Sequence, residues 1–540
     1  MKSLIAALIL VSSIVQLSYA EPLHSSAARR SYNQQLGRRA YAPLDQDNWL
    51  GGSGYWSNGS SWSLNAPPGQ ADDATIGGVS DYVHFDVGTA SINSLTLSGT
   101  LTDDGLASQL TMANSSLNVT STGVLDFSAS IFGTGTYTYD HSYNYGKISA
   151  AVLFLGSYGG DFDNYSVMNL GSLNIPDYAG SFTNYGVMNV GGIGTSSMSG
   201  GFHNATGATL ITTGGASLGN IGNDGQWDNY GSISGTGNRY GGSLGNTGVL
   251  NNHAGGAINL YYQDYFDNHG IFNNDGSLYI DSIRGGGTFS NFGGAVLTNN
   301  GSITAYGAFD NGGIFINNGT FVGQGGNEGS IVNNGIFNTF GTLGPGFTNT
   351  GSYVQNGPQS ATYVGAIFST TTPLQINGGL LSGDGIIQGD VNMSGTLHPG
   401  TAPFPSGCYN PSSCRLLTIQ GNYQQFGVGT FYAELGGTVA GYNYDQLAIT
   451  GNAALDGTLD VKIPGGNAFA VGSTFFLLTY GSETGQFSMI DLPALDGGEV
   501  WNYAYEPTDF KLWITPEPSS LVLLGGGLLG MAGMLRRKLS

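Results

Sequence analysis

The residues with the clearest chemical potential are four ionisable side chains in one stretch, Asp264, Asp267, Asp281 and Arg284. A polysaccharide hydrolase needs two or three carboxylates that converge on one bond. A lyase needs a strong base, usually Arg or Lys, beside acids that bind calcium or a uronate. Three tyrosines of the same stretch could stack on a sugar: Tyr261, Tyr262 and Tyr265. This stretch is the best candidate for catalysis on a polysaccharide.

A simpler interpretation competes with catalysis. Asp267 occupies a variable position of an internal repeat, and the same position elsewhere holds Thr183, His203 and Ser290. A position that accepts such different side chains is more typical of a solvated surface than of a catalytic group. We therefore expect no catalytic residue, and a polysaccharide lyase or hydrolase is the alternative.

Metal-binding patterns are weak. No two of the seven histidines have the paired spacing of a metal site; they are His24, His84, His141, His203, His253, His269 and His398. No aspartate-rich calcium loop recurs. Two acidic pairs, Asp72 with Asp73 and Asp161 with Asp163, could bind calcium loosely. The sequence predicts no cofactor and no metal site beyond such loosely bound calcium.

The only two cysteines, Cys408 and Cys414, flank a short loop. In an exported chain such a pair predicts a disulfide more strongly than a metal or redox site. Because the loop is short, the disulfide would add no more than about 2 kcal/mol of global stability.

Three of the six tryptophans lie near the start, at Trp49, Trp56 and Trp62. Their large apolar area suits a lid over the open end of a stack of strands, which would otherwise present unpaired edges. A glycan site is the alternative, since aromatic rings also stack on sugars. The run from Trp49 to Ser57, with Trp62 and the Pro-Gly and Asp-Asp pairs that follow, resembles the N-terminal opening of many secreted bacterial β-strand-repeat proteins.

Composition excludes several classes of protein. Charged residues make up 9% of the chain, and glycine accounts for 92 of 540 residues, far from a helical enzyme domain. Between residues 43 and 515 there are six lysines and arginines against 33 acids, a net charge of −27. Such a body has no cationic surface that could neutralise the phosphates of a nucleic-acid backbone, so it should not bind nucleic acid. With 40% hydrophobic residues in short regular runs, it has ample material for a core.

The central region carries an overt repeat. Its unit is an apolar residue, any residue, Asn, any residue and then usually Gly, and it begins at Phe162, Phe182, Phe202, Trp227, Leu244, Phe266, Phe289, Phe309, Ile331 and Phe347. A period of about 20 residues with β-type alternation is typical of one coil of a parallel β-helix. Stacked coils would place the apolar residues inside and let the asparagines pass hydrogen bonds from coil to coil at the corners. A glycine shortly after the asparagine would permit the positive φ of a tight corner.

The fold class is therefore all-β, a parallel β-helix or β-solenoid with caps at both ends. Residues 43–80 form the tryptophan-rich cap, residues 81–373 the repeats and residues 374–515 a C-terminal β module with longer strands. The repeats resemble the passenger stalks of autotransporters and other bacterial surface adhesins. The last module resembles the final coils of such passengers, which implies a capping role.

The N-terminus predicts export. Residues 1–20 have Lys2, an apolar segment and a Ser-Tyr-Ala end, which together are typical of a signal peptide helix cleaved between Ala20 and Glu21. Residues 21–42 hold two arginine pairs among polar residues and predict a flexible basic leader.

The C-terminus combines Pro516-Glu517-Pro518, an apolar run at residues 521–535, and the basic stop Arg536-Arg537-Lys538. As a helix the run would cover about 22 Å, short of a hydrocarbon layer of about 30 Å. The basic stop should stay cytoplasmic and leave the body outside. A core helix is the alternative, which the run's five glycines disfavour.

This arrangement resembles the PEP-CTERM sorting signal of bacterial exported proteins, over the last 25 residues or so. The resemblance implies recognition and cleavage by an exosortase-type membrane enzyme. It also implies transient inner-membrane anchoring through residues 521–535, followed by release to the cell surface, the outer membrane or an extracellular matrix. We therefore expect an exported structural or adhesive protein, with an extracellular polysaccharide as a candidate partner. The alternative is a β-helix that binds or degrades polysaccharide.

Overall fold

The structure is a computed structural model that describes residues 45–538 except 114–115, 135–140, 157–159, 196–200, 236–240, 282–285, 401–414 and 496. Residues from Gln46 onward form one compact unit. Several sequence predictions lie outside the described residues: the signal peptide with Ala20 and Glu21, the leader, Arg284, and the pair Cys408 and Cys414.

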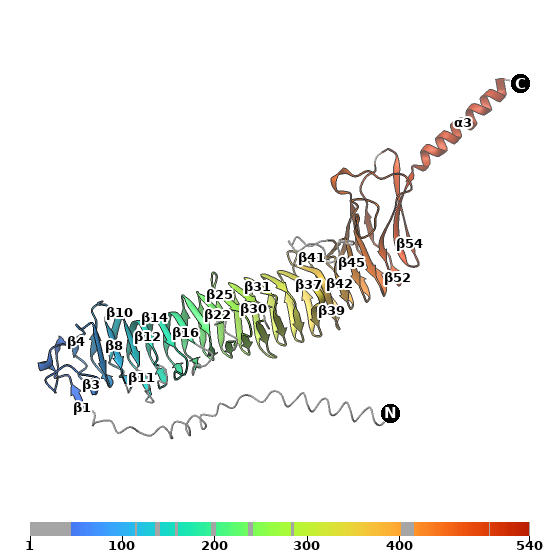
Figure 1. Cartoon of the computed structure of the whole chain (residues 1–540). Coiled ribbons are helices and arrows are strands. Elements are labelled where there is room, and N and C mark those ends of the chain that lie inside the picture. Colours follow the sequence, from blue (N-terminus) through green and yellow to red (C-terminus); the bar gives the residue numbers. More distant parts are fainter. Residues whose placement is uncertain are drawn as a thin grey trace, which may run out of the picture. The chain divides into compact units, whose positions relative to one another are not determined.

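The body is a parallel β-helix with three strands in each coil, which confirms the predicted fold class. In one coil these are β26 (Tyr265–Asn268), β27 (Ile271–Asn274) and β28 (Ser277–Ile280). Each pairs in parallel with the equivalent strand of the next coil, β26 with β29, β27 with β30 and β28 with β31. The strands of successive coils therefore lie side by side in three sheets (Figure 1).

Sheet 1 contains β26 and its equivalents. These are β1 (Asp45–Asn48), β3 (Asp72–Ile76), β6 (Ser94–Leu97), β9 (Leu117–Val119), β11 (Ser142–Asn144), β13 (Phe162–Asn164), β15 (Phe182–Asn184), β17 (Phe202–Asn204), β20 (Asn220–Asn223), β23 (Ser243–Asn246), β29 (Thr288–Asn291), β32 (Ala308–Asn311), β35 (Gly325–Asn327), β42 (Ile386–Gln388), β45 (Leu416–Ile419), β48 (Gln446–Ile449) and β51 (Thr474–Thr479).

Sheet 2 contains β27 and its equivalents. These are β2 (Ser53–Tyr55), β4 (Tyr82–His84), β7 (Thr100–Thr102), β18 (Thr209–Thr212), β21 (Gln226–Asn229), β24 (Val249–Asn252), β30 (Val296–Asn299), β33 (Ile314–Asn317), β36 (Ser330–Asn333), β38 (Ser352–Gln355), β40 (Leu374–Ile376), β43 (Val391–Met393), β46 (Tyr423–Gln425), β49 (Asn452–Leu455) and β52 (Ser482–Gly485).

Sheet 3 contains β28 and its equivalents. These are β5 (Thr89–Ile92), β8 (Gln109–Met112), β19 (Gly215–Leu218), β22 (Ser232–Gly235), β25 (Ala257–Leu260), β31 (Ser302–Ala305), β34 (Thr320–Gly323), β41 (Leu380–Gly383), β44 (Thr396–Pro399), β47 (Thr430–Glu434), β50 (Thr458–Lys462) and β53 (Met489–Asp491).

Six longer strands turn a corner and so belong to two sheets. Four run through sheets 2 and 3: β10 (Val124–Thr134), β12 (Lys147–Phe154), β14 (Val167–Ile175) and β16 (Val187–Thr195). Two run through sheets 3 and 1: β37 (Ile336–Asn349) and β39 (Ala361–Thr370). The antiparallel hairpin of β54 (Glu499–Glu506) and β55 (Asp509–Pro516) ends the body, with β55 antiparallel to β51. Helix α3 (Pro518–Lys538) follows.

The core follows from the alternation of each strand. In β29 and its equivalents every second side chain is buried, as a two-residue period requires. Buried phenylalanines of successive coils stack on one another: the ring centroids of Phe162 and Phe182 are 5.2 Å apart, and those of Phe182 and Phe202 are 5.5 Å apart. The apolar residues of the repeat therefore lie inside, as predicted.

Buried asparagines form two hydrogen-bonded ladders along the coils. In ladder 1, at the ends of the sheet 1 strands, each side-chain amide donates to the carbonyl oxygen of the next: Asn144, Asn164, Asn184, Asn204, Asn223, Asn246, Asn268, Asn291, Asn311, Asn327 and Asn349. Ladder 2, at the ends of the sheet 2 strands, runs through Asn229, Asn252, Asn274, Asn299, Asn317 and Asn333.

The predicted coil-to-coil hydrogen bonds of the asparagines are confirmed, but the repeat positions named from the sequence mix two corners of the coil. Asn229 and Asn333 belong to ladder 2, while ladder 1 passes through Asn223 and Asn327 instead. Both corners of a coil carry the same local pattern of apolar residue, any residue and Asn. The sequence pattern alone therefore does not separate the two corners. The uneven spacing of the repeat arises partly because its list of positions includes asparagines from both ladders.

The predicted positive φ of the corner glycines is confirmed at some corners, such as Gly207 after Asn204 and Gly294 after Asn291, but not at the shorter corners. Gly270 follows Asn268, yet its φ is not positive. A Cβ at Gly270 would lie 2.2 Å from the carbonyl oxygen of Gly248, the equivalent glycine one coil earlier. The same holds for Gly276 against Gly256, at 2.1 Å. Glycine is required here because consecutive coils approach too closely for any side chain.

Removing one asparagine from ladder 1 should destabilise the body more than removing one from the surface. Asn268→Ala leaves the Asn246 amide and the Asn291 carbonyl oxygen without their partners, which bond to Asn268 at 2.8 and 2.7 Å. Each buried unpaired group costs about 1–3 kcal/mol. We expect a loss of about 2–4 kcal/mol in the free energy of unfolding from urea titration of the purified chain.

Asn273→Ala is the matched control, because Asn273 bonds to Asn251 in a row of partly exposed asparagines. It should cost less than about 1 kcal/mol. Equal losses in the two variants would contradict the role given to ladder 1.

Candidate functional site

The C-terminal motif begins within the last strand, since Pro516 is the final residue of β55. The Glu517 amide donates to Gly498 O at 2.8 Å, and α3 begins at Pro518, a residue that the first helical position tolerates. Arg536, Arg537 and Lys538 lie in the last turn, where positive charge is favourable.

Among the described residues, no helix, α3 included, is both long and apolar enough to cross a membrane. The prediction of a transmembrane helix at residues 521–535 is therefore not supported. The five glycines within the apolar run lower its hydropathy: Gly525, Gly526, Gly527, Gly530 and Gly533.

The three N-terminal tryptophans lie inside the first coils. Trp49, Trp56 and Trp62 are 6%, 1% and 0% exposed. The rings of Trp49 and Trp56 pack edge-on against Trp62, with centroids 5.2 and 4.9 Å away, and Trp62 Nε1 donates to Trp56 O at 2.9 Å. Trp56 also packs on Phe85, the first ring of the core stack. No ring face is free for a sugar, so the alternative of a glycan site at these tryptophans is wrong.

The candidate catalytic residues occupy different environments. Asp264 is buried, and its two oxygens accept the amides of Tyr261 and Gly242 at 2.8 and 2.7 Å. Burial raises the pKa of Asp264 despite these bonds. Asp267 instead lies on the outer face of β26, between Gly245 and Ser290 of the neighbouring coils. Asp281 follows β28, and Arg284 lies outside the described residues. Asp264 therefore fixes a turn, because both its oxygens are occupied.

The acidic pairs considered for calcium also have protein partners. Asp73 accepts bonds from Asn93 and Ser94, both at 2.6 Å, and Asp72 accepts the Gly69 amide at 2.7 Å. Asp161 accepts the Ser181 amide at 2.7 Å, and Asp163 lies 3.0 Å from His141. These contacts explain the four carboxylates as links within and between coils.

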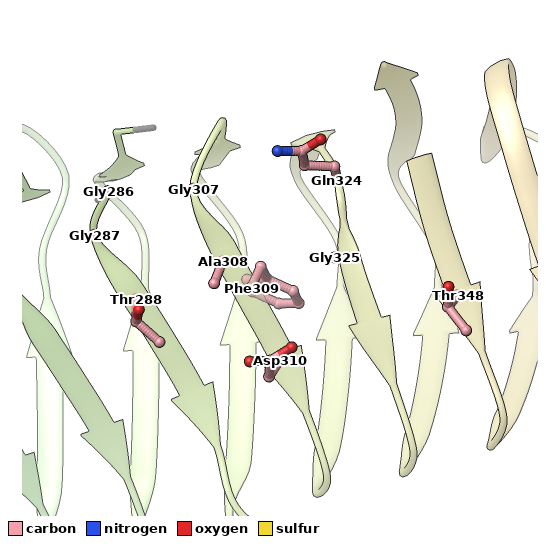
Figure 2. A pocket seen from close by; sticks show the side chains of 10 residues that line it. All are labelled: Gly286, Gly287, Thr288, Gly307, Ala308, Phe309, Asp310, Gln324, Gly325 and Thr348. Atoms are coloured by element: carbon pink, nitrogen blue, oxygen red, sulfur yellow. The ribbon is translucent and has the colours of Figure 1, made fainter. Parts of the chain in front are cut away.

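An open groove of about 410 Å³ crosses the outer face of sheet 1 (Figure 2). Gly287, Gly307 and Gly325 keep it shallow and open, and its polar groups come from Thr288, Asp310, Gln324 and Thr348. Asp310 lies in the same row of outward-facing positions as Asp267, two coils away, with Ser290 between them. Partial desolvation, reinforced by the charge of Glu328, raises the pKa of Asp310.

Exposed tyrosines form a second surface feature. Tyr145, Tyr165 and Tyr185 stack with centroids 4.8 and 4.7 Å apart and interplanar angles of 7° and 4°. Both faces of the middle ring, Tyr165, are therefore covered by its neighbours. Desolvation, together with Asp163 and the neighbouring tyrosines, raises the pKa of Tyr165 to about 12.

Five histidines lie against an aspartate: His84 against Asp104, His141 against Asp163, His203 against Asp224, His253 against Asp228, and His398 against Asp445. His398 differs from the other four, because a second carboxylate completes a group of three possible ligands. Donor atoms of His398, Glu434 and Asp445 all lie within 4.8 Å of one another, the one such group among the described residues.

The strand pairing explains how this group forms. His398 lies on β44 and Glu434 ends β47, which pairs with β44 in parallel. Asp445 directly precedes β48, and its amide donates to Glu434 O at 3.0 Å. In return the Glu434 amide donates to Asp445 Oδ2 at 2.8 Å. Two adjacent coils thus position the three side chains.

One arginine neutralises much of this group. Arg415 Nη1 lies 2.8 Å from Asp445 Oδ1 and 3.2 Å from Glu434 Oε2. Burial opposes the charge of Arg415, but Asp445 and Glu434 outweigh it and raise the pKa of the guanidinium. The Tyr432 hydroxyl donates to Glu434 Oε1 at 3.3 Å, and its ring packs edge-on against His398. Sequence reasoning missed this cluster, since its members are separated by 11 to 47 residues and meet only through coil stacking.

Comparison with known proteins identifies one segment. Residues 515–538 match the PEP-CTERM protein-sorting motif. The match includes the Pro516-Glu517-Pro518 motif, the apolar run and the basic stop, as the sequence predicted. A PEP-CTERM motif implies an exported protein that an exosortase-type enzyme recognises. No curated protein matches the chain.

Replacing a buried tryptophan of the N-terminal cluster should destabilise the fold. Trp62→Ala removes a fully buried ring from the end of the core, and we expect a loss of about 3–5 kcal/mol in the free energy of unfolding. Tyr55→Ala, in the same segment but 59% exposed, is the control and should cost less than about 1 kcal/mol. Urea titration, with unfolding monitored by far-UV circular dichroism of the backbone, measures both losses. A stable Trp62→Ala variant would contradict the packing role.

Proposed function

We propose that this chain is an exported structural and adhesive β-solenoid of the cell surface or extracellular matrix, similar in design to an adhesin stalk. The observation that carries the proposal is the PEP-CTERM motif placed at the end of the strand that closes the β-helix. The last strand ends at Pro516, the first residue of the motif, and α3 begins at Pro518; this close junction suits delivery of an already folded protein to the surface.

The ladders support a mechanical role. Cross-coil hydrogen bonds run without interruption from Asn144 to Asn349, and Asn349 continues to Thr370. Each coil is tied to the next by backbone bonds in three sheets and by these amides. Such a body resists bending between coils, because any tilt would break buried hydrogen bonds.

The net negative charge of the body is compatible with a location outside the cell among anionic polymers. With six cations against 33 acids between residues 43 and 515, it stays soluble and is repelled by anionic surfaces. Adhesion would then use neutral groups rather than cationic patches. Catalysis is not part of the proposal, because the oxygens of Asp264 are both occupied by backbone amides.

Mass spectrometry of the mature protein from its own cells tests the sorting step. We expect a chain that begins at Glu21 and lacks the segment after the Pro516-Glu517-Pro518 motif, recovered from the surface or matrix fraction. Glu517→Gln should retain the tail and accumulate in the cell envelope, because recognition of the motif is lost. Glu483→Gln, another carboxylate of the C-terminal module, should be processed as the wild type.

A mature protein that keeps residues 521–540 would remove the processing step from the proposal. Processing of the Glu517→Gln variant at the wild-type rate would show that the processing enzyme does not recognise the carboxylate of Glu517.

A second candidate, contact with an extracellular polysaccharide, is favoured by the groove of sheet 1. Its glycines leave the backbone accessible, and Thr288, Asp310 and Thr348 place hydroxyl and carboxylate groups on three of four consecutive coils (Figure 2). Because the body is strongly acidic, the glycan should be neutral.

A glycan-binding assay with neutral and uronate polysaccharides tests this candidate. Binding to a neutral polysaccharide should fall at least about tenfold in Thr348→Arg, which fills the groove with a large side chain, equivalent to about 1.4 kcal/mol. Thr298→Arg, on the outer face of sheet 2, is the control. Equal binding by both variants would exclude the groove as the contact site.

A further inference from the structure

We propose that His398, Glu434 and Asp445 bind one divalent transition-metal ion of the zinc class. The sequence predicted no such site, and neither the sorting motif nor the proposed function requires it. The proposal rests on the donor set, its geometry, its charge and the rigidity of the strands that hold it.

The donor set selects the kind of ion. One imidazole nitrogen and two carboxylate oxygens suit zinc and similar metals, whereas calcium and magnesium prefer ligands that are all oxygen. The other described histidine–aspartate pairs, such as His253 with Asp228, are not part of any such group of three. They serve as the internal comparison for the site.

The geometry fits a single ion. Zinc lies about 2.0–2.2 Å from nitrogen and oxygen ligands, so two ligands of one tetrahedral ion are roughly 3–4 Å apart. His398 Nε2 lies 3.1 Å from Asp445 Oδ2, and all three donor atoms lie within 4.8 Å of one another. Small rotations of the side chains would therefore bring them to one centre. Three protein ligands leave a fourth position for water or for Tyr432, whose hydroxyl already contacts Glu434.

The charge of the cluster favours a further cation. Asp445 is fully buried and Glu434 is partly buried, while Arg415 is the single fixed positive charge that touches both. Two carboxylates with one arginine carry a net negative charge, and a divalent ion that displaces Arg415 would balance both carboxylates. The Arg415 side chain is 31% exposed, so its guanidinium can leave the two carboxylates and turn to solvent when a metal ion binds them. Arg415 and the metal therefore compete for the same oxygens.

The supporting backbone is rigid enough for a preformed site. Glu434 and Asp445 exchange backbone and side-chain hydrogen bonds, and Leu435 bridges Tyr444 beside them. His398 comes from the preceding coil through the pairing of β44 with β47. A bound ion would thus tie two coils together in the C-terminal module.

Isothermal titration of the purified, chelator-treated full chain with zinc chloride, in excess calcium chloride, tests the proposal. We expect one zinc ion per chain, and an affinity at least about tenfold lower in His398→Ala and in Glu434→Gln. His253→Ala should bind as the wild type. Arg415→Gln should bind more tightly, because it removes the competing cation.

A thermal melt of each variant guards against loss of fold. Zinc should raise the melting temperature of the wild type and of His253→Ala but not that of His398→Ala, since an ion stabilises only the state that binds it. Zinc binding that survives both His398→Ala and Glu434→Gln, or that calcium abolishes, would place the ion elsewhere on the acidic surface and overturn the proposal. Absence of zinc binding by the wild type would also overturn it.

Discussion

The structure depends on hydrogen bonds between buried asparagine side chains of successive coils. The side-chain amide of asparagine donates through its NH2 group and accepts through its carbonyl oxygen. A stack of asparagines therefore pairs these groups only when each coil places its asparagine directly above the one before. From Asn144 to Asn349 the spacing along the chain varies from 16 to 23 residues, yet the amides remain within 2.5 to 2.8 Å of one another. Corners of different length absorb part of this variation, since two residues separate Asn223 from β21 but four separate Asn204 from β18.

Close approach at the corners is the second constraint. Once the asparagines set the height of each coil, the residues two positions beyond them, such as Gly248 and Gly270, come too near for a side chain. The high glycine content is thus a consequence of coil stacking and not a sign of a loose chain. A stack of this kind has two open ends, and the tryptophan cluster at one end and the antiparallel hairpin β54–β55 at the other cover them.

The sequence predicted the fold class and the inward direction of the apolar residues, because a repeat of about 20 residues reports directly on a coil. It did not separate the two ladders, since Asn229 and Asn246 follow the same local pattern but lie at different corners. It also suggested positive φ at corner glycines, some of which instead lack room for a Cβ. The cluster of His398, Glu434 and Asp445 was out of reach, because no local spacing relates residues that only coil stacking brings together.

The functional proposal follows from this continuity: the sorting motif delivers a body whose coils are all connected. Hydrogen–deuterium exchange along the whole chain tests that continuity most directly. The account predicts that the ladder-bearing strands from β11 to β38 exchange slowly and together, while exposed residues of the described turns, such as Ala254 and Gly255, exchange faster. Protection that falls into separate blocks, or that is lost at the coils carrying Asn246 and Asn268, would contradict a continuous asparagine-laddered β-helix.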